Sequence, residues 1–332
     1  MKVYVVGAGA VGTYLGDLLQ GIGNEVTYAP RELEAVVPVE ADLVLVTVKS
    51  YDTPGAIATL RRALREPNAA TIVTPQNGIG NEELLAAAFG ADAVVSAALT
   101  VPVELGPSGR GVAAKGGGIA FAPVGGASPH NWLLAAFGAT GLQTSAVRDY
   151  RSLKWSKLAL NIIANATCAI LDVLPERLVH EDEVFALEIR AIREVRLTMK
   201  ALGIAPIDLP RYPVRALLAI ATMPTPIARA VLASRIASAR GEKPPSLLLD
   251  LRSAKHRTEV ENLNGAVGRA ARDAGIAAPV NTAFARILSD VAHMPQLWAK
   301  YRERPEELVG EVRAETGRSQ VASTDGKGEV DA

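Results

Sequence analysis

Three glycines near the amino terminus constrain this chain more than any other feature. The segment Gly7-Ala8-Gly9-Ala10-Val11-Gly12 follows a short β-rich run, Lys2 to Val6, and precedes a helical segment, Thr13 to Gln20. In such a pattern the first glycine permits a tight turn, the second lets the backbone approach a pyrophosphate, and the third allows close helix–strand packing. The following helix N-terminus offers free N–H groups to phosphates. We therefore predict a dinucleotide-binding loop, with a glycine-rich turn in an unrelated α/β protein as the alternative.

Predicted strands and helices alternate behind this loop, which is typical of a doubly wound parallel sheet. Between residues 101 and 126 glycines gather among short β segments, which we interpret as strands that complete the sheet. The predicted strands are Lys2–Val6, Glu25–Tyr28, Asp42–Val48, Ala70–Thr74, Ala93–Ala97 and Thr144–Val147, and the helices among them are Thr53–Arg65, Asn81–Phe89 and Trp132–Ala139.

Strand patterns stop at about Tyr150, and long helical patterns interrupted by prolines continue to about residue 314. The fold class predicted is an α/β N-terminal Rossmann-type doubly wound parallel sheet plus an all-α C-terminal domain. The domains expected are an NADP-binding Rossmann domain over 1–148 and a helical substrate domain over 149–315. Residues 316–332 are small and polar, so we predict a disordered tail there.

Composition restricts the classes of function. The 35 Lys+Arg balance 35 Asp+Glu, so charge favours neither a nucleic-acid nor a membrane-surface partner. No apolar run is long enough to span a bilayer. A single cysteine, Cys168, fits a reducing cytoplasm. The four histidines are scattered, so no metal site is predicted. The segment Leu297 to Tyr301 is interpreted as packing, with a homodimer interface left open.

The cofactor type depends on the end of the second predicted strand, which reads Val26-Thr27-Tyr28-Ala29-Pro30-Arg31. NAD enzymes place an acidic residue at this point to bind the ribose 2′-hydroxyl. Here no acidic residue stands at the strand end, and Arg31 is available to a 2′-phosphate because its guanidinium group suits that geometry. NADP(H) is therefore favoured, while Glu32 could serve NAD if the loop shifts by one residue.

A polar stripe is predicted at the start of the helical region. Lys157, Asn161 and Asn165 recur every four residues, which places them on one face of a helix. Apolar residues surround them, so this helix is expected to be largely buried and its polar groups need partners or a ligand. The alternative is a hydrogen-bonded packing stripe with the lysine extending to water. The residues alone do not decide between these readings.

Several motifs together resemble the ketopantoate reductase (2-dehydropantoate 2-reductase) family over about residues 1 to 290. They are the glycine loop, Thr47-Val48-Lys49, Gln76-Asn77-Gly78-Ile79-Gly80-Asn81-Glu82, Lys154-Trp155-x-Lys157-x3-Asn161-x3-Asn165, Thr258-Glu259-Val260-x3-Asn264-Gly265 and Gly275-Ile276-x2-Pro279-Val280-Asn281. The resemblance implies hydride transfer from NADPH to the ketone of a 2-oxo acid, in the route to pantothenate and coenzyme A.

The same resemblance implies roles for residues of the helical region. Lys157 would be the general acid that protonates the forming alkoxide, and an ammonium group suits that task. Glu259 would orient the lysine and the substrate, and Asn161 and Asn165 would contact the substrate. A glutamate near the start of a predicted helix, Thr258 to Ala274, also has a simple electrostatic reason to be there.

Further roles fall on loops. Asn77 would lie between cofactor and substrate, and Lys49, at the end of a predicted strand, would lie near the cofactor. Ser246 is the predicted substrate-binding serine. Leu-Leu-Leu follows Ser246 where the family usually has Met-Leu-Gln, and the stretch from Asp250 to Glu259 is one residue longer. These departures affect the predicted substrate more than the reaction.

Two other functions stay open at this point. The first is an NAD(P)H-dependent reductase of a different 2-oxo acid on the same fold. The second is a dinucleotide-binding sensor without catalysis. A pure binding protein has no need of a buried proton donor, so the set Lys157, Asn161, Asn165 and Glu259 argues against the sensor.

Overall fold

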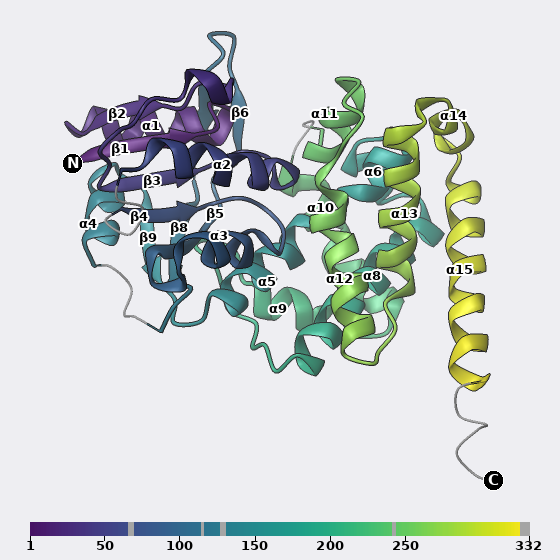
Figure 1. Cartoon of the computed structure of the whole chain (residues 1–332). Coiled ribbons are helices and arrows are strands. Elements are labelled where there is room, and N and C mark those ends of the chain that lie inside the picture. The colour runs from purple at the N-terminus through teal and green to yellow at the C-terminus, as the bar shows by residue number, and fades with distance from the viewer. Residues whose placement is uncertain (66–69, 114–115, 127–130, 241–243, 326–332) are drawn as a thin grey trace. The chain divides into compact units, whose positions relative to one another are not determined.

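The computed structural model describes residues 1–65, 70–113, 116–126, 131–240 and 244–325 (Figure 1). The chain divides into two compact units. The first contains Met1–Lys157 and also Pro206–Pro213, and the second contains Leu158–Ala205 and the chain from Val214 onward. The division falls inside helix α5 (Tyr150–Asn161), whereas the sequence-based boundary at 148/149 lies just before that helix.

The first unit is built on a seven-stranded sheet in the order β2-β1-β3-β4-β5-β8-β9. All neighbouring strands pair in parallel except β5 and β8, which are antiparallel. The predicted Rossmann-type sheet is therefore confirmed, with one antiparallel pair that the sequence did not reveal. The strands are β1 (Lys2–Val6), β2 (Glu25–Tyr28), β3 (Leu43–Val46), β4 (Thr71–Thr74), β5 (Val94–Leu99), β8 (Gly118–Pro123) and β9 (Gln143–Ala146).

Alternate residues of the strands feed two separate cores, because successive side chains of a strand point to opposite faces. One core joins strand residues such as Val3 and Val5 to α1 (Ala10–Gly21) and α4 (Asn131–Ala139). The other joins residues such as Tyr4 and Val6 to α2 (Thr53–Ala63) and α3 (Asn81–Phe89). Burial on both faces explains the nearly continuous apolar strands of the sequence.

The prediction that strands within residues 101–126 complete the sheet is confirmed for β8 and wrong for the segment between β5 and β8. Its two short strands, β6 (Val103–Leu105) and β7 (Gly111–Ala113), do not complete the main sheet but form a separate antiparallel hairpin. A tight turn with Gly109 in a left-handed conformation (φ +74°) joins them. Because the connection from β5 to β8 is this hairpin and not a crossover helix, β8 pairs antiparallel to β5.

The second unit is helical. Its helices are the end of α5, α6 (Ala166–Leu171), α7 (Pro175–Leu178), α8 (Asp182–Ala201), α9 (Val214–Ile220), α10 (Thr225–Arg240), α11 (Ser246–Arg252), α12 (Asn264–Asp273), α13 (Pro279–His293), α14 (Trp298–Tyr301) and α15 (Pro305–Asp325). None of the helices in the described ranges is long and apolar enough to cross a membrane.

Two details of the last helices bear on the sequence-based predictions. α15 extends through residues 316–325, where disorder was predicted, and residues 326–332 lie outside the described part of the chain.

Trp298 and Tyr301 are buried within their own unit, and Trp298 Nε1 donates to the carbonyls of Ala169 (2.9 Å) and Ile170 (3.0 Å). Packing therefore accounts for these two aromatic residues.

Helix α13 lies at the centre of the second unit and contacts α6, α8, α12 and α15 (Figure 1). Its first turn is held by a buried carboxylate from α8. Glu194 accepts hydrogen bonds from the backbone N–H of Val280 (3.0 Å) and Asn281 (2.9 Å) and from the Asn281 side chain (2.8 Å). A carboxylate suits this place because the N-terminus of a helix carries a partial positive charge.

Burial nevertheless raises the pKa of Glu194, because loss of water outweighs the hydrogen bonds that favour the charged form. A carboxyl whose pKa is higher in the folded than in the unfolded chain stabilises the fold below its unfolded pKa and loses that contribution as pH rises through the folded pKa. The free energy of unfolding of wild type minus that of Glu194→Gln should therefore fall as pH rises from 4.5, the ordinary pKa of a glutamate, toward neutrality. Urea titrations across this range measure it, and a difference that rises with pH would contradict the assignment.

Candidate functional site

The glycine loop follows β1 directly and is shaped by close contacts with Thr47 and Val48, which follow β3. Gly7 has a positive φ (+110°), and a Cβ there would lie 2.6 Å from Val48 N. A Cβ on Gly12 would overlap the carbonyl oxygen of Gly7. By contrast, a Cβ on Gly9 would meet nothing within 4 Å. Two glycines are therefore needed for the fold of the loop, while Gly9 leaves open space in front of the first turn of α1.

Two hydroxyl groups hold the loop in place. Thr47 Oγ1 donates to the carbonyl oxygen of Gly7 (2.6 Å), and Thr13 Oγ1 donates to that of Gly9 (2.8 Å). Thr13 Oγ1 also accepts from Gly111 N (2.7 Å), so the β6–β7 hairpin contacts the first turn of α1. Sequence reasoning missed this contact, because the hairpin and the loop are about 100 residues apart.

Arg31 lies just beyond β2 on an exposed loop, and Glu32 beside it is also exposed. Tyr28, at the end of β2, turns its hydroxyl toward α1, where a Cβ on Gly16 would overlap it. The strand end thus carries no acidic side chain, and the first charged group after it is the Arg31 guanidinium. This placement leaves Arg31 available to a phosphate of a ligand.

Lys49 and Asn77 follow β3 and β4, which are neighbouring parallel strands. Lys49 precedes a short 3₁₀ turn (Ser50–Asp52), and Asn77 precedes Gly78, which has a positive φ (+85°). Both side chains are partly buried. A hydrogen bond joins the two loops, since Ser50 Oγ donates to the carbonyl oxygen of Asn77 (2.8 Å). The structure therefore brings the loops of these two predicted residues together at the carboxyl edge of the sheet.

The predicted polar stripe does not lie on one helix. α5 ends at Asn161, and Asn165 lies at the start of α6. Between them Ala164 adopts a left-handed conformation (φ +49°), which the buried carboxylate of Glu188 supports by accepting from Ala164 N (2.9 Å). Lys157 and Asn161 are thus one turn apart on α5. The prediction that Asn165 lies on the same face of the same helix was wrong. Apolar periodicity could not show this interruption, because the apolar residues continue across it.

Asn165 is almost fully buried, with 2% of its surface exposed. Its Nδ2 donates to the carbonyl oxygen of Asn161 (3.0 Å) and lies 3.4 Å from Ser246 Oγ, and its Oδ1 accepts from Leu247 N (3.1 Å). The end of α5, the start of α6 and the start of α11 therefore meet at this one amide. Three of the predicted substrate residues, Asn161, Asn165 and Ser246, are close together in the second unit.

Glu259 is buried at the start of a short 3₁₀ helix, η4 (Glu259–Asn262). The Thr258 hydroxyl caps this turn by accepting from Val260 N (3.4 Å). The continuous helix predicted over 258–274 was wrong, because the chain leaves helical geometry at Leu263 (φ −103°, ψ −100°) before α12 begins. Glu259 is therefore placed by a separate short turn, which the apolar pattern of the sequence did not distinguish from α12.

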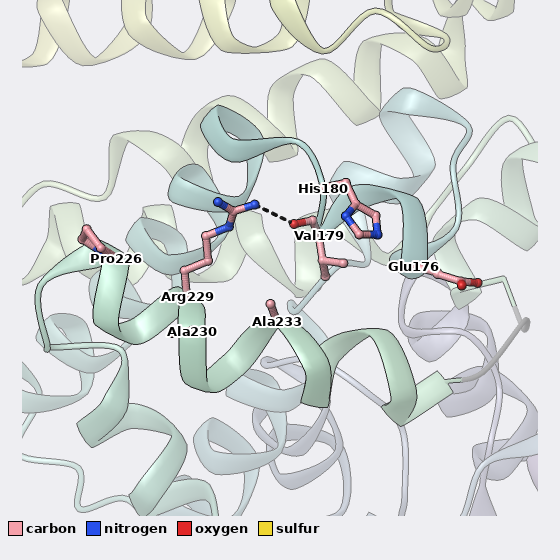
Figure 2. A pocket seen from close by; sticks show the side chains of 7 residues that line it. All are labelled: Glu176, Val179, His180, Pro226, Arg229, Ala230 and Ala233. Atoms are coloured by element: carbon pink, nitrogen blue, oxygen red, sulfur yellow. Dashed lines mark hydrogen bonds between the residues drawn. The ribbon is translucent and has the colours of Figure 1, made fainter.

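A cavity of about 570 Å³ opens in the second unit beside α7 and α10 (Figure 2). Arg229 extends across it and donates to the carbonyl oxygen of Val179 (3.1 Å). None of the predicted site residues lines this cavity, so we do not assign the reaction to it. Its lining residues are Glu176, Val179, His180, Pro226, Arg229, Ala230 and Ala233.

Comparison with known proteins shows the family of the chain. Two family models match the chain: the ketopantoate reductase PanE/ApbA model over residues 28–126 and its C-terminal counterpart over residues 149–292. A 2-dehydropantoate 2-reductase of Halobacterium salinarum is 28% identical over an alignment of 329 residues. The alignment covers 89% of this chain and 99% of that protein.

Two solved structures have similar folds. A PanE/ApbA family ketopantoate reductase from Ralstonia eutropha superimposes with a TM-score of 0.73 at 27% identity, covering 89% of this chain and 100% of that one. A D-mandelate dehydrogenase in complex with NADH superimposes with a TM-score of 0.72 at 18% identity, covering 88% and 99%. The second likeness concerns the fold alone.

The glycine loop gives a sharp prediction. Gly9→Ala should fold normally, because its φ of −82° suits alanine and the added Cβ meets no protein atom. The same methyl group should obstruct a pyrophosphate, so the Kd for NADPH should rise about tenfold or more. Gly12→Ala is the comparison, because its Cβ overlaps Gly7 O and should lower the melting temperature. Fluorescence titration and thermal unfolding measure both effects, and unchanged NADPH binding by Gly9→Ala would refute the assigned loop.

Proposed function

Because this chain belongs to the ketopantoate reductase family, we propose that it reduces the ketone of 2-dehydropantoate to the hydroxyl of pantoate with NADPH. This reaction belongs to pantothenate and coenzyme A biosynthesis. The observation that carries the proposal is the position of Lys157, a partly buried lysine on α5. It belongs to the same compact unit as the glycine loop, Lys49 and Asn77.

The dinucleotide fits the glycine loop for a structural reason. The open space at Gly9 lets a pyrophosphate approach the backbone, and the first turn of α1 presents N–H groups beside it. Arg31 would pair with the 2′-phosphate, and Lys49 and Asn77 would contact the nicotinamide half at the carboxyl edge of the sheet. When bound, NADPH supplies the hydride that reduces the ketone carbon.

Lys157 then supplies the proton. Its ammonium group would donate a hydrogen bond to the ketone oxygen and stabilise the negative charge that develops there during reduction. Transfer of one proton from Nζ converts the alkoxide to a hydroxyl and leaves a neutral amine, which solvent reprotonates. Partial burial strengthens the electrostatic part of this role, because a charge acts more strongly where water is depleted.

Asn161 and Ser246 would bind the substrate directly. Asn161 and Ser246 are partly buried and carry groups suited to a carboxylate or a hydroxyl. For Asn165 we propose a supporting role instead of direct contact, since its amide already binds Asn161 O and Leu247 N. The orienting role of Glu259 that the family resemblance implies stays a prediction.

The function is tested by the oxidation of NADPH with a panel of 2-oxo acids. We expect the highest kcat/KM with 2-dehydropantoate, against pyruvate and 2-oxoisovalerate as comparison substrates. Lys157→Ala should lower kcat about 100-fold or more while NADPH still binds, because a positioned proton donor contributes that much. If only another 2-oxo acid is reduced, the proposed reaction type stands and 2-dehydropantoate is not the substrate. If Lys157→Ala turns over as fast as wild type, Lys157 is not the proton donor.

Cofactor preference is tested at Arg31. Arg31→Ala should raise the KM for NADPH about tenfold to a hundredfold, because one charge-assisted contact to the 2′-phosphate is lost. The KM for NADH should stay nearly constant, since NADH lacks that phosphate. The neighbouring variant Glu32→Ala is the matched control and should leave the preference for NADPH unchanged. An equal rise in KM for NADPH and NADH in Arg31→Ala would show that Arg31 does not bind the 2′-phosphate.

A further inference from the structure

A buried ion pair lies one turn before Lys157. Lys154 Nζ is 3.0 Å from Glu82 Oε1, and these side chains are only 3% and 1% exposed. Lys154 Nζ also donates to the carbonyl oxygen of Gln76, and Ser96 Oγ donates to Glu82 Oε1 (2.8 Å). The pair therefore connects α5 to α3, to β5 and to the loop that follows β4.

The side chain of Gln76 extends the same network to the loop that follows β3. Its Nε2 donates to the carbonyl oxygen of Val48 (3.0 Å) and to Thr53 Oγ1 (2.9 Å). Its Oε1 accepts from Thr74 Oγ1 (2.9 Å). The residue immediately before Lys49 and the residue immediately before Asn77 are thus tied to each other through one amide.

A second set of hydrogen bonds closes the network. Asn81 Nδ2 donates to Ser50 Oγ (3.1 Å) and to the carbonyl oxygen of Asn77 (3.1 Å), which also accepts from Ser50 Oγ (2.8 Å). Asn81 Oδ1 in turn accepts from Thr53 Oγ1 (2.8 Å). The backbone around Lys49 and Asn77 is therefore held on both sides by buried polar groups.

Stability alone is a poor reason for such an arrangement. Removing two charges from water costs free energy, and apolar residues of similar volume often stabilise a buried site as well as an ion pair does. What the network does supply is fixed geometry, because every polar group in it has defined partners. Lys49, Asn77 and Lys157 each lie within three residues of a member of the network.

We propose that Lys154 and Glu82 are positioning residues, which hold α5 against the 76–81 loop and so set the place of Lys157 relative to Asn77 and Lys49. This inference rests on the proposed reduction. Neither residue touches the substrate in this role. A displacement of about 1 Å between reacting groups lowers the rate about 100-fold, so loss of the network should be visible mainly in kcat.

The test uses the double variant Lys154→Met/Glu82→Gln, which removes both charges so that neither is left unpaired. We expect kcat to fall about 100-fold and the Kd for NADPH to rise by no more than about tenfold, because the glycine loop that would hold the pyrophosphate is untouched and only the loops of Lys49 and Asn77 are loosened. Glu194→Gln is the matched control: it also removes a buried carboxylate, but in the second unit, and its kcat should stay within about twofold. The single variant Lys154→Arg should retain more activity than the double variant, because it keeps a cation that can pair with Glu82.

Hydrogen exchange provides a readout that does not depend on turnover. Amides of residues 48–52 and 76–81 should exchange faster in the double variant than in wild type, while those of α1 should not. If wild type reduces no 2-oxo acid, the proposed function fails, and the exchange data still decide whether the network holds these loops. Wild-type kcat in the double variant, or unchanged exchange in both loops, would overturn the positioning role.

Discussion

The glycine loop depends on one hydroxyl group from the residue that directly follows a neighbouring strand. Thr47 Oγ1 donates to the carbonyl oxygen of Gly7 (2.6 Å), at the point where the chain leaves β1 with a positive φ. The same small region excludes any Cβ on Gly7 or Gly12. Because β1 and β3 are paired in parallel, their carboxyl ends lie at the same edge of the sheet, which brings Thr47 beside Gly7. The glycines thus leave room for the close approach, and the Thr47 hydroxyl holds the turn at Gly7.

Two buried carboxylates show that similar groups serve different purposes in the two units. Glu194 accepts three hydrogen bonds at the start of α13, so its effect is on the placement of a central helix of its unit. Glu82 instead faces a lysine and a serine at the end of the sheet, beside loops that carry predicted site residues. The first is a helix-terminal interaction that any helical unit could use, whereas the second is part of a network around a site.

Sequence reasoning predicted the elements whose causes are local. The strands Lys2–Val6 and Glu25–Tyr28 and the helix Asn81–Phe89 were predicted with the bounds that the structure has. The interruption at Ala164 was not foreseen, because its support comes from Glu188, 24 residues away. The β6–β7 hairpin likewise takes its place from Thr13. Such features depend on long-range hydrogen bonds, which an apolar pattern does not encode.

The site illustrates the same limit. The motif around Asn77 was recognised, yet the roles of Gln76, Asn81 and Glu82 within it were not apparent until their side chains were seen to bond to Thr53 and Lys154. Gln76, Asn81, Glu82 and Lys154 were present in the quoted motifs without an assigned chemical task. Their partners were far apart in the chain, so only the fold could reveal them.

Helix α5 combines these arguments, because its successive turns have different partners. Lys154 is fixed by Glu82 and Gln76, whereas Asn161 at the end of the helix has its carbonyl oxygen bound by Asn165. Lys157 lies between them and is the last residue of the first unit. A lysine side chain is long and flexible, so a proton donor of this type is only as well placed as the backbone that carries it. The contacts of Lys154, one turn earlier, therefore fix the part of the α5 backbone from which the Lys157 side chain extends.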